Sequence, residues 1–278
     1  MKRYKVFNKG LISPFRRMKY EIGKTYTCED FDVTFTGCSR GFYATKIEGI
    51  PYSWNNSGNK EIYLCEVSGK KVEYDKYKMR YEKIKIIRKC TDGEIIEKAK
   101  SIERKIGYNL AEALFPVNPL LVKPKKVSKK DIENIKKWAS VRASVRASVR
   151  DSVWDSVWGS VWDSIRNSVG DSFGNSFGIS IRNSIRNSFG NSIKSHVWSH
   201  VWDSVWDSVW GYVSSLFYGI EEWKYFDNCE NGVNPFQPCI DLWRRGFVVS
   251  FDGSIYRLHS GRKSKIVYEI KKDDLEES

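Results

Sequence analysis

The sequence predicts a mixed fold in which a β-solenoid of four-residue repeats joins an N-terminal α+β domain to a small β-rich C-terminal cap. Three observations favour this fold class. Short strand-like runs separated by Gly, Asn and Ser clusters fill the first ninety residues. A four-residue repeat then runs from 139 to 213 without an insertion. Alternating apolar patterns return near the C-terminus, where strands are predicted at Phe247–Phe251, Ile255–His259 and Ile266–Ile270 with a hairpin turn at Asp252-Gly253. A long α-helical repeat is the alternative for the middle segment.

Changes in composition along the 278 residues predict five segments. They are an α+β domain (1–114), a Pro/Lys-rich linker (115–127), a capping helix (128–138), the solenoid (139–213) and a cap domain (214–278). Three prolines within nine residues interrupt regular structure in the linker, so the first boundary belongs there.

The N-terminal domain is expected to contain short strands and one helix. Its strands are predicted at Tyr4–Phe7, Val33–Thr36, Glu61–Val67 and Lys83–Ile87. Thr91 and Glu94 form a T-x-x-E capping signal, and apolar residues follow at helical spacing until Gly107.

A second capping signal precedes the repeat. Ser128 and Asp131 begin a short helix in which Ile132, Ile135 and Trp138 share one face. We expect this helix to cover the open end of the solenoid, as terminal caps do in repeat proteins.

In the repeat, Val, Ile or Phe stands at every fourth position from Val141 to Val213, nineteen times in all. An α-helix would rotate this stripe by about 40° per repeat, so no single face would stay buried. Extended structure keeps residues four apart on one side. Asp, Asn or Gly stands two places before 13 of the 19 apolar residues and favours turns there. The pattern therefore favours stacked rungs with a turn in every repeat.

The position after each apolar residue supplies the candidate binding residues. Stacked rungs would align them into outward columns, and monomers seldom leave so much apolar area bare. Trp and Arg are also favoured anchors at interfaces. Burial under other parts of the chain is the alternative for the tryptophans, and a solvated face is the alternative for the arginines. The candidates are Arg142, Arg146, Arg150, Trp154, Trp158, Trp162, Trp198, Trp202, Trp206 and Trp210.

No catalytic or metal site is predicted, and no cofactor is implied. His196 and His200 have a spacing that can hold zinc, but both take the Ser position of the repeat, so drift within the array explains them more simply. The six cysteines are scattered without a CxxC pair and are interpreted as reduced thiols.

The charge is uneven. Residues 1–138 contain 31 Lys and Arg against 17 Asp and Glu, which is a net charge of +14. The whole chain has a net charge of +13, so all of the positive excess lies in these residues. This excess can attract nucleic acid, although lysine-rich surfaces also keep proteins soluble. No apolar run approaches the ~20 residues of a membrane span, and no apolar stretch follows the basic start. We therefore expect a cytoplasmic protein with no membrane partner.

Several motifs carry a resemblance. The run with YEIGKTY, GFYAT, CEVSG and KIKIIR resembles the N-terminal domain of an uncharacterised family of phage and bacterial repeat proteins, in which the second motif usually reads Gly-Phe-His-Ala-Cys. In this sequence Tyr43 and Thr45 stand in place of that His and Cys. The repeat and the tail FQPCIDLWRRGFVVSFDGSIYRLHSG are also similar to phage proteins. The resemblance implies a phage origin and the host cytoplasm.

These observations favour a non-enzymatic scaffold or interaction protein that binds a host protein or another copy of itself. One alternative is an enzyme, because the strand order with a late V-S-G resembles small ADP-ribosyltransferases, although no catalytic glutamate can be placed. The other is a nucleic-acid-binding protein that uses the basic N-terminal domain.

Overall fold

The computed structural model describes residues 1–14, 16–36, 39–51, 60–73, 79–123, 125–156, 181, 184–185, 195–217, 220–226 and 232–276. The chain divides into two compact units, and the boundary between them lies after Phe115. Among the described residues, those up to Phe115 form unit 1 and those from Pro116 onward form unit 2. No helix among the described residues is long and apolar enough to cross a membrane.

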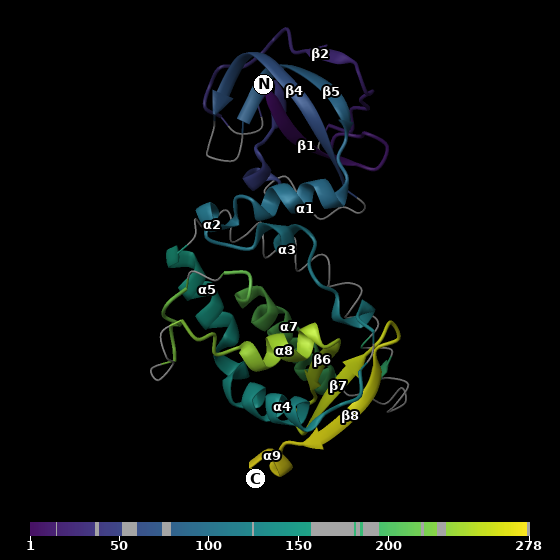
Figure 1. Ribbon diagram of the computed structural model, residues 1–278, viewed down its shortest axis with the longest axis vertical. Coiled ribbons are helices and arrows are strands. Elements are labelled where there is room, and N and C mark those ends of the chain that lie inside the picture. Colours follow the sequence, from purple (N-terminus) through teal and green to yellow (C-terminus); the bar gives the residue numbers. More distant parts are fainter. Residues whose placement is uncertain are drawn as a thin grey trace. The chain divides into compact units, whose positions relative to one another are not determined.

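Unit 1 is built on an antiparallel sheet (Figure 1). Its strands are β1 (Lys2–Asn8), β2 (Thr25–Thr27), β3 (Phe42–Ala44), β4 (Lys60–Glu73) and β5 (Met79–Lys89). The strand order is β1-β4-β5-β2, and β3 pairs with a separate part of β5. Reciprocal backbone hydrogen bonds of 2.8 Å between Tyr4 and Thr45 join the end of β3 to β1. The four strands β1, β4, β5 and β3 therefore close into a ring.

The interior of this ring is rich in aromatic side chains. Phe7 contacts Tyr20 and Tyr63 with ring centroids 5.1 and 5.4 Å apart, and Cys65 is fully buried beside them. Edge-to-face and tilted ring pairs of this kind add to the free energy of burial.

Short helices follow the sheet: η1 (Ile47–Gly49), α1 (Asp92–Lys100), α2 (Glu103–Ile106) and α3 (Leu110–Leu114). The Thr91 side chain accepts a hydrogen bond from the Glu94 amide, so the predicted helix start is confirmed. The predicted single helix is instead divided in two at Ser101, and Gly107 ends the second part in the left-handed conformation.

Unit 2 packs helices against a three-stranded antiparallel sheet. Its elements are η3 (Pro119–Leu121), α4 (Lys129–Val141), η4 (Arg142–Ser144), α5 (Val145–Ser156), α7 (Ser195–Ser214), α8 (Gln237–Arg244), β6 (Phe247–Phe251), β7 (Ile255–Ser260), β8 (Lys265–Lys271) and α9 (Asp273–Glu276). The sheet order is β6-β7-β8. The three strands lie where the sequence predicts them, and Asp252 accepts from the Ser254 and Ile255 amides to form the predicted turn.

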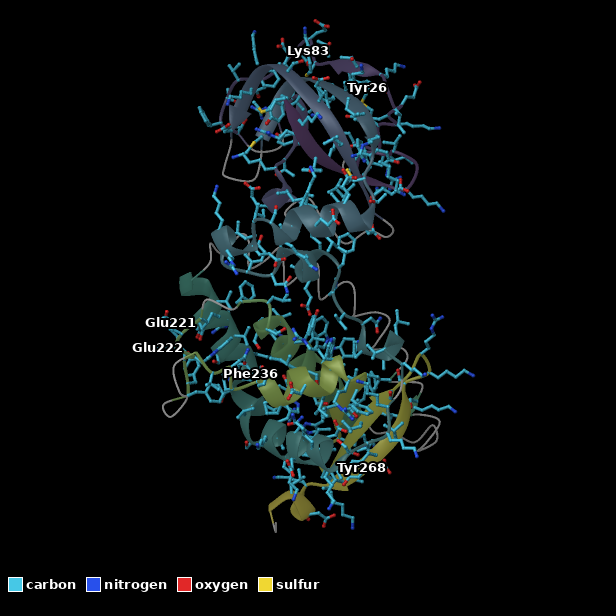
Figure 2. All side chains as sticks on the ribbon, viewed as in Figure 1. Tyr26, Lys83, Glu221, Glu222, Phe236 and Tyr268 are labelled. Carbon is cyan, nitrogen blue, oxygen red and sulfur yellow. The ribbon has the colours of Figure 1, made fainter. Side chains whose placement is uncertain are left out.

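Phe236, which is labelled in Figure 2, is fully buried in unit 2 and is surrounded by aromatic side chains. Its ring is 5.4 Å from Trp223, 5.4 Å from Phe226 and 6.4 Å from Trp138. Gly211 of the repeat lies nearby, where an added Cβ would be 3.1 Å from the Cys239 Sγ and 3.3 Å from the Trp138 ring. The absence of a side chain at Gly211 therefore lets α4, α7 and α8 approach closely.

The prediction of a β-solenoid over 139–213 is wrong. Every described element in that range is helical: the end of α4, η4, α5 and α7. One long helical repeat is not supported either, because the 3₁₀ turn η4 separates α4 from α5, and α5 packs against α7. A stripe that rotates by ~40° per repeat stays on one side for the four or five repeats of a short helix. Accordingly, Val201, Val205, Val209 and Val213 of α7 are all buried.

Two further expectations also need correction. The 128–138 helix has no solenoid end to cover, and it packs against α8 instead. Its Ser128–Asp131 capping box is present as predicted. Residues Val33–Thr36 form no strand, and Thr34 and Thr36 direct their carbonyl oxygens at Arg80.

Candidate interaction surface

Helix α7 uses the repeated serine to contact the edge of the sheet. Strand β6 pairs with β7 on one side only, so its outer backbone groups require other partners. The Ser204 Oγ accepts a hydrogen bond from the Phe251 amide at 2.7 Å and donates to the Val201 carbonyl at 2.8 Å. The Ser208 Oγ lies 3.2 Å from the Val249 carbonyl. The two hydroxyl groups therefore link a helix to the open edge of a strand.

The spacing of the repeat suits this contact. Residues four apart on an α-helix are separated by ~6 Å along its axis. Alternate residues of a strand are separated by ~6.8 Å, and alternate residues direct their backbone groups at the same edge. Ser204 and Ser208 therefore meet Phe251 and Val249, which are two residues apart on β6.

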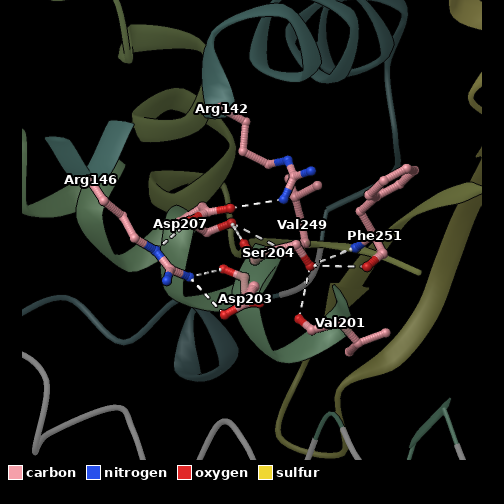
Figure 3. Close-up of polar contacts among 9 residues, drawn as sticks. Arg142, Arg146, Val201, Asp203, Ser204, Asp207, Val249 and Phe251 are labelled. Atoms are coloured by element: carbon pink, nitrogen blue, oxygen red, sulfur yellow. Dashed lines mark hydrogen bonds and ion pairs between the residues drawn. The ribbon is translucent and has the colours of Figure 1, made fainter. Parts of the chain in front are cut away.

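Two of the predicted arginines meet α7 through ion pairs. The Arg142 Nη1 lies 2.8 Å from the Asp207 Oδ2, and the Arg146 Nε lies 2.7 Å from the Asp207 Oδ1. Arg146 also donates to the Asp203 carbonyl oxygen at 2.7 Å and contacts its carboxylate at 3.3 Å (Figure 3). The repeat thus supplies both partners, because the arginines come from η4 and α5 and the aspartates from α7.

Asp207 is the buried carboxylate of this cluster of ion pairs. Burial raises the pKa of the Asp207 carboxyl above its usual value, and the guanidinium groups of Arg146 and Arg142 oppose that rise. Arg142 also lies over the Phe251 ring, 5.1 Å from its centroid. Arg142 and Arg146 are therefore engaged within unit 2.

The tryptophans of α7 form a ladder on another face. Trp198 and Trp202 have ring centroids 6.2 Å apart, and Trp202 and Trp206 have centroids 6.0 Å apart. Trp follows Ser by two positions in the repeat, which places it ~200° around the helix and opposite the serine face. All four tryptophans of α7, including Trp210, are only partly buried. The α7 face turned away from β6 is therefore aromatic and partly open.

The other predicted residues are distributed differently. Arg150 is exposed and pairs with Asp151 at 2.7 Å. The backbone of Trp154 belongs to α5, but its side chain is not described, and Trp158 and Trp162 lie outside the described residues. The structure brings Arg142, Arg146 and the α7 tryptophans onto neighbouring elements of one unit.

The histidine pair forms no site among the residues that the structure describes. His200 is exposed, and the His196 side chain is not described. No group of three or more His, Cys, Asp or Glu residues in the described ranges is arranged to hold a metal ion.

Unit 1 contains a buried arginine that the sequence patterns did not single out. Arg80 donates to the carbonyl oxygens of Asp32, Thr34 and Thr36 at 2.6 to 3.0 Å. It also lies 3.2 Å from the Tyr43 hydroxyl. The Gly41 of the GFYAT motif has a φ of +142°, and an added Cβ there would be 2.5 Å from the Arg80 Cγ. The motif therefore leaves room for the arginine that holds the 32–36 segment.

Lys5 is the second unusual cation of unit 1. Its Nζ donates to the Tyr43 carbonyl at 2.7 Å and lies 5.5 Å from the Phe7 ring centroid and 6.0 Å from that of Tyr20. Burial lowers the pKa of Lys5 to about 8. Tyr43 therefore contacts both cations, Lys5 through its backbone and Arg80 through its hydroxyl.

Comparison with known families matches part of this unit. Residues 1–98 match the family model of a domain of unknown function, DUF7666. The matched range ends within α1 and includes the strand ring, Lys5 and Arg80. No curated protein and no solved structure matches the chain. The DUF7666 match supports a relation to an uncharacterised family and assigns no activity to unit 1.

Proposed function

We propose that the protein is a non-enzymatic interaction protein whose α7 tryptophan ladder binds a protein partner, in the simplest case a second copy of the chain. The observation that supports this proposal is the row of tilted and edge-to-face ring contacts among Trp198, Trp202 and Trp206 on a face that β6 does not cover. Large, rigid aromatic side chains are favoured anchors at protein interfaces because they bury much area and lose little conformational entropy.

The internal contacts of α7 add support. Its serine face is bound to β6, and Asp203 and Asp207 are bound to arginines. These contacts hold the helix in place, so the ladder is presented on a rigid support. A preorganised surface loses less entropy on binding than a mobile one.

The test replaces Trp202 and Trp206 together with Ser and follows association by sedimentation velocity at increasing protein concentration. The wild-type chain is expected to self-associate and the double variant to remain monomeric. A second variant with Phe at both positions keeps aromatic area and is expected to associate more weakly than wild type but more strongly than the Ser variant. Circular dichroism checks that both variants keep the helical content of the wild type.

If the wild type is monomeric, the proposal of a second copy as the partner is wrong. Immobilised wild-type and variant proteins are then compared for the proteins that they retain from an extract of the host cell that the resemblance to phage proteins implies. A partner retained by the wild type and the Phe variant but lost from the Ser variant supports the proposal. Equal retention by all three proteins contradicts it.

A further inference from the structure

Unit 2 carries a concentrated basic surface. Five lysines of the linker and the start of α4 are exposed: Lys123, Lys125, Lys126, Lys129 and Lys130. Within the described part of the chain, none of the five is in an ion pair. The β7–β8 turn adds the exposed cations Arg262, Lys263 and Lys265.

Contacts at Gly246 indicate that the linker and the β7–β8 turn lie close together. The Ser260 Oγ donates to the Gly246 carbonyl at 2.9 Å, which places the end of β7 beside Gly246. An added Cβ at Gly246 would be 3.2 Å from both the Pro119 carbonyl oxygen and the Val122 Cβ, which places the linker there too. Lys123 and the turn after Ser260 therefore flank the same glycine. Arg245, the residue before Gly246, forms an ion pair with Asp131 at 2.6 Å and lies 3.4 Å from the Lys126 carbonyl oxygen.

The composition of the surface is one-sided. The stretches 122–130, 244–246 and 261–265 contain ten Lys and Arg and no Asp or Glu. Lys129 and Lys130 also lie in the first turn of α4, where the helix dipole disfavours positive charge. The capping box occupies the Ser128 and Asp131 amides. The positive charges of Lys129 and Lys130 are therefore expected to lower the stability of α4.

We propose that this surface, formed by the 122–130 linker and the β7–β8 turn, binds the phosphate backbone of double-stranded nucleic acid. Closely spaced lysines release counterions from a dense array of phosphates. Single-strand binding commonly relies on aromatic side chains on which bases stack, and the three stretches contain none. Contacts to phosphate groups carry no sequence information directly, so this binding is expected to be independent of base sequence. The site lies in unit 2, separate from the basic N-terminal domain.

The experiment measures binding of the full chain to a fluorescein-labelled duplex by anisotropy, between about 50 and 200 mM salt. Wild type is expected to bind with a steep salt dependence. Replacing Lys125 and Lys126 with Gln should weaken binding by roughly tenfold and reduce the slope of log K against log salt by about 2. Replacing Lys129 and Lys130 with Gln should weaken binding while raising Tm, because it removes charge opposed to the helix dipole.

The matched control replaces the exposed Lys70 and Lys83 of unit 1 with Gln, which removes the same charge; Lys83 lies on the outer surface of that unit (Figure 2). The control is expected to bind as wild type. An equal loss in the control overturns the proposal, because binding would then follow total charge. Tighter binding to the single strand than to the duplex also overturns the proposal. So does tighter binding to vesicles containing phosphatidylserine than to the duplex.

Discussion

His259 is fully buried in β7 and connects two neighbouring segments. Its Nδ1 lies 3.0 Å from the Ser264 carbonyl oxygen, which can only accept, so Nδ1 carries the proton. The Nε2 atom then accepts from the Ser250 hydroxyl at 2.7 Å. Burial is the main cause that lowers the pKa of His259 to about 4, and nearby Arg257 lowers it further. The Ser250–His259 pair is sealed inside the sheet and serves its packing.

The low pKa of His259 predicts that the free energy of unfolding decreases at acid pH. The unfolded chain binds its proton near pH 6.5 and the folded chain near pH 4, so the stabilisation is present above pH 6.5 and is lost as the pH falls toward 4. Between pH 7 and pH 5 the loss is about 2 kcal/mol. Urea unfolding of wild type and of His259→Gln at both pH values measures it. The variant does not titrate there, so an equal pH dependence in both proteins would refute the assignment.

At the scale of elements, α7 shows how a repeat can form a helix that the sequence argues against. Turn-favouring Asp residues occupy the position two before Val, yet Asp203 and Asp207 instead bind Arg146 and Arg142. Ser204 uses its hydroxyl to complete the β6 edge. Such long-range contacts override local propensity, and they connect residues ~50 to 65 positions apart, so the four-residue period alone cannot reveal them.

Local signals were more reliable. The Thr91 and Ser128 caps and the Asp252 turn involve partners within three residues, and all three are present. The sequence named the α7 tryptophans and the arginines as candidate binding residues, but it did not indicate that Arg142 and Arg146 pair with α7. Arg80 and Lys5 were missed because their charges are satisfied by carbonyl oxygens, which leave no pattern in the sequence.

The serine contacts give a prediction for α7. Replacing Ser204 and Ser208 with Ala leaves the buried Phe251 amide and Val249 carbonyl without these partners, which should lower the free energy of unfolding by about 2 to 3 kcal/mol. The matched control is Ser215→Ala, because among the described residues the Ser215 hydroxyl bonds only the Tyr212 carbonyl of its own turn. That change should be within about 0.5 kcal/mol. Thermal or urea unfolding measures both, and equal effects would argue against the edge contact.

At the scale of the whole molecule, the described residues of each unit include a core of their own. The aromatic core of unit 1 is made of residues from Phe7 to Ile86, whereas the core of unit 2 is arranged around Phe236. The basic excess is divided between them as well. Of the net +14 in residues 1–138, residues 116–138 contribute seven lysines against two acidic residues, and these belong to unit 2. The charge that the sequence assigned to the N-terminal third therefore belongs to two different units.

Because the described core of unit 1 consists of residues between Phe7 and Ile86, we expect unit 1 to fold alone. A fragment of residues 1–115 contains the strand ring, the Arg80 contacts and α1 to α3, so it should unfold in one cooperative thermal transition and give dispersed amide resonances.

Within that fragment, Gly41→Ala should prevent or strongly weaken folding, because the new Cβ would overlap the Arg80 side chain at a backbone angle that favours glycine. The exposed Gly10, whose φ is +82° and whose Cβ position is open, provides the matched control as Gly10→Ala, since it tests the backbone angle without the overlap. An unfolded wild-type fragment would show that unit 1 depends on the rest of the chain, and equal losses in the two variants would show that the contact with Arg80 contributes little.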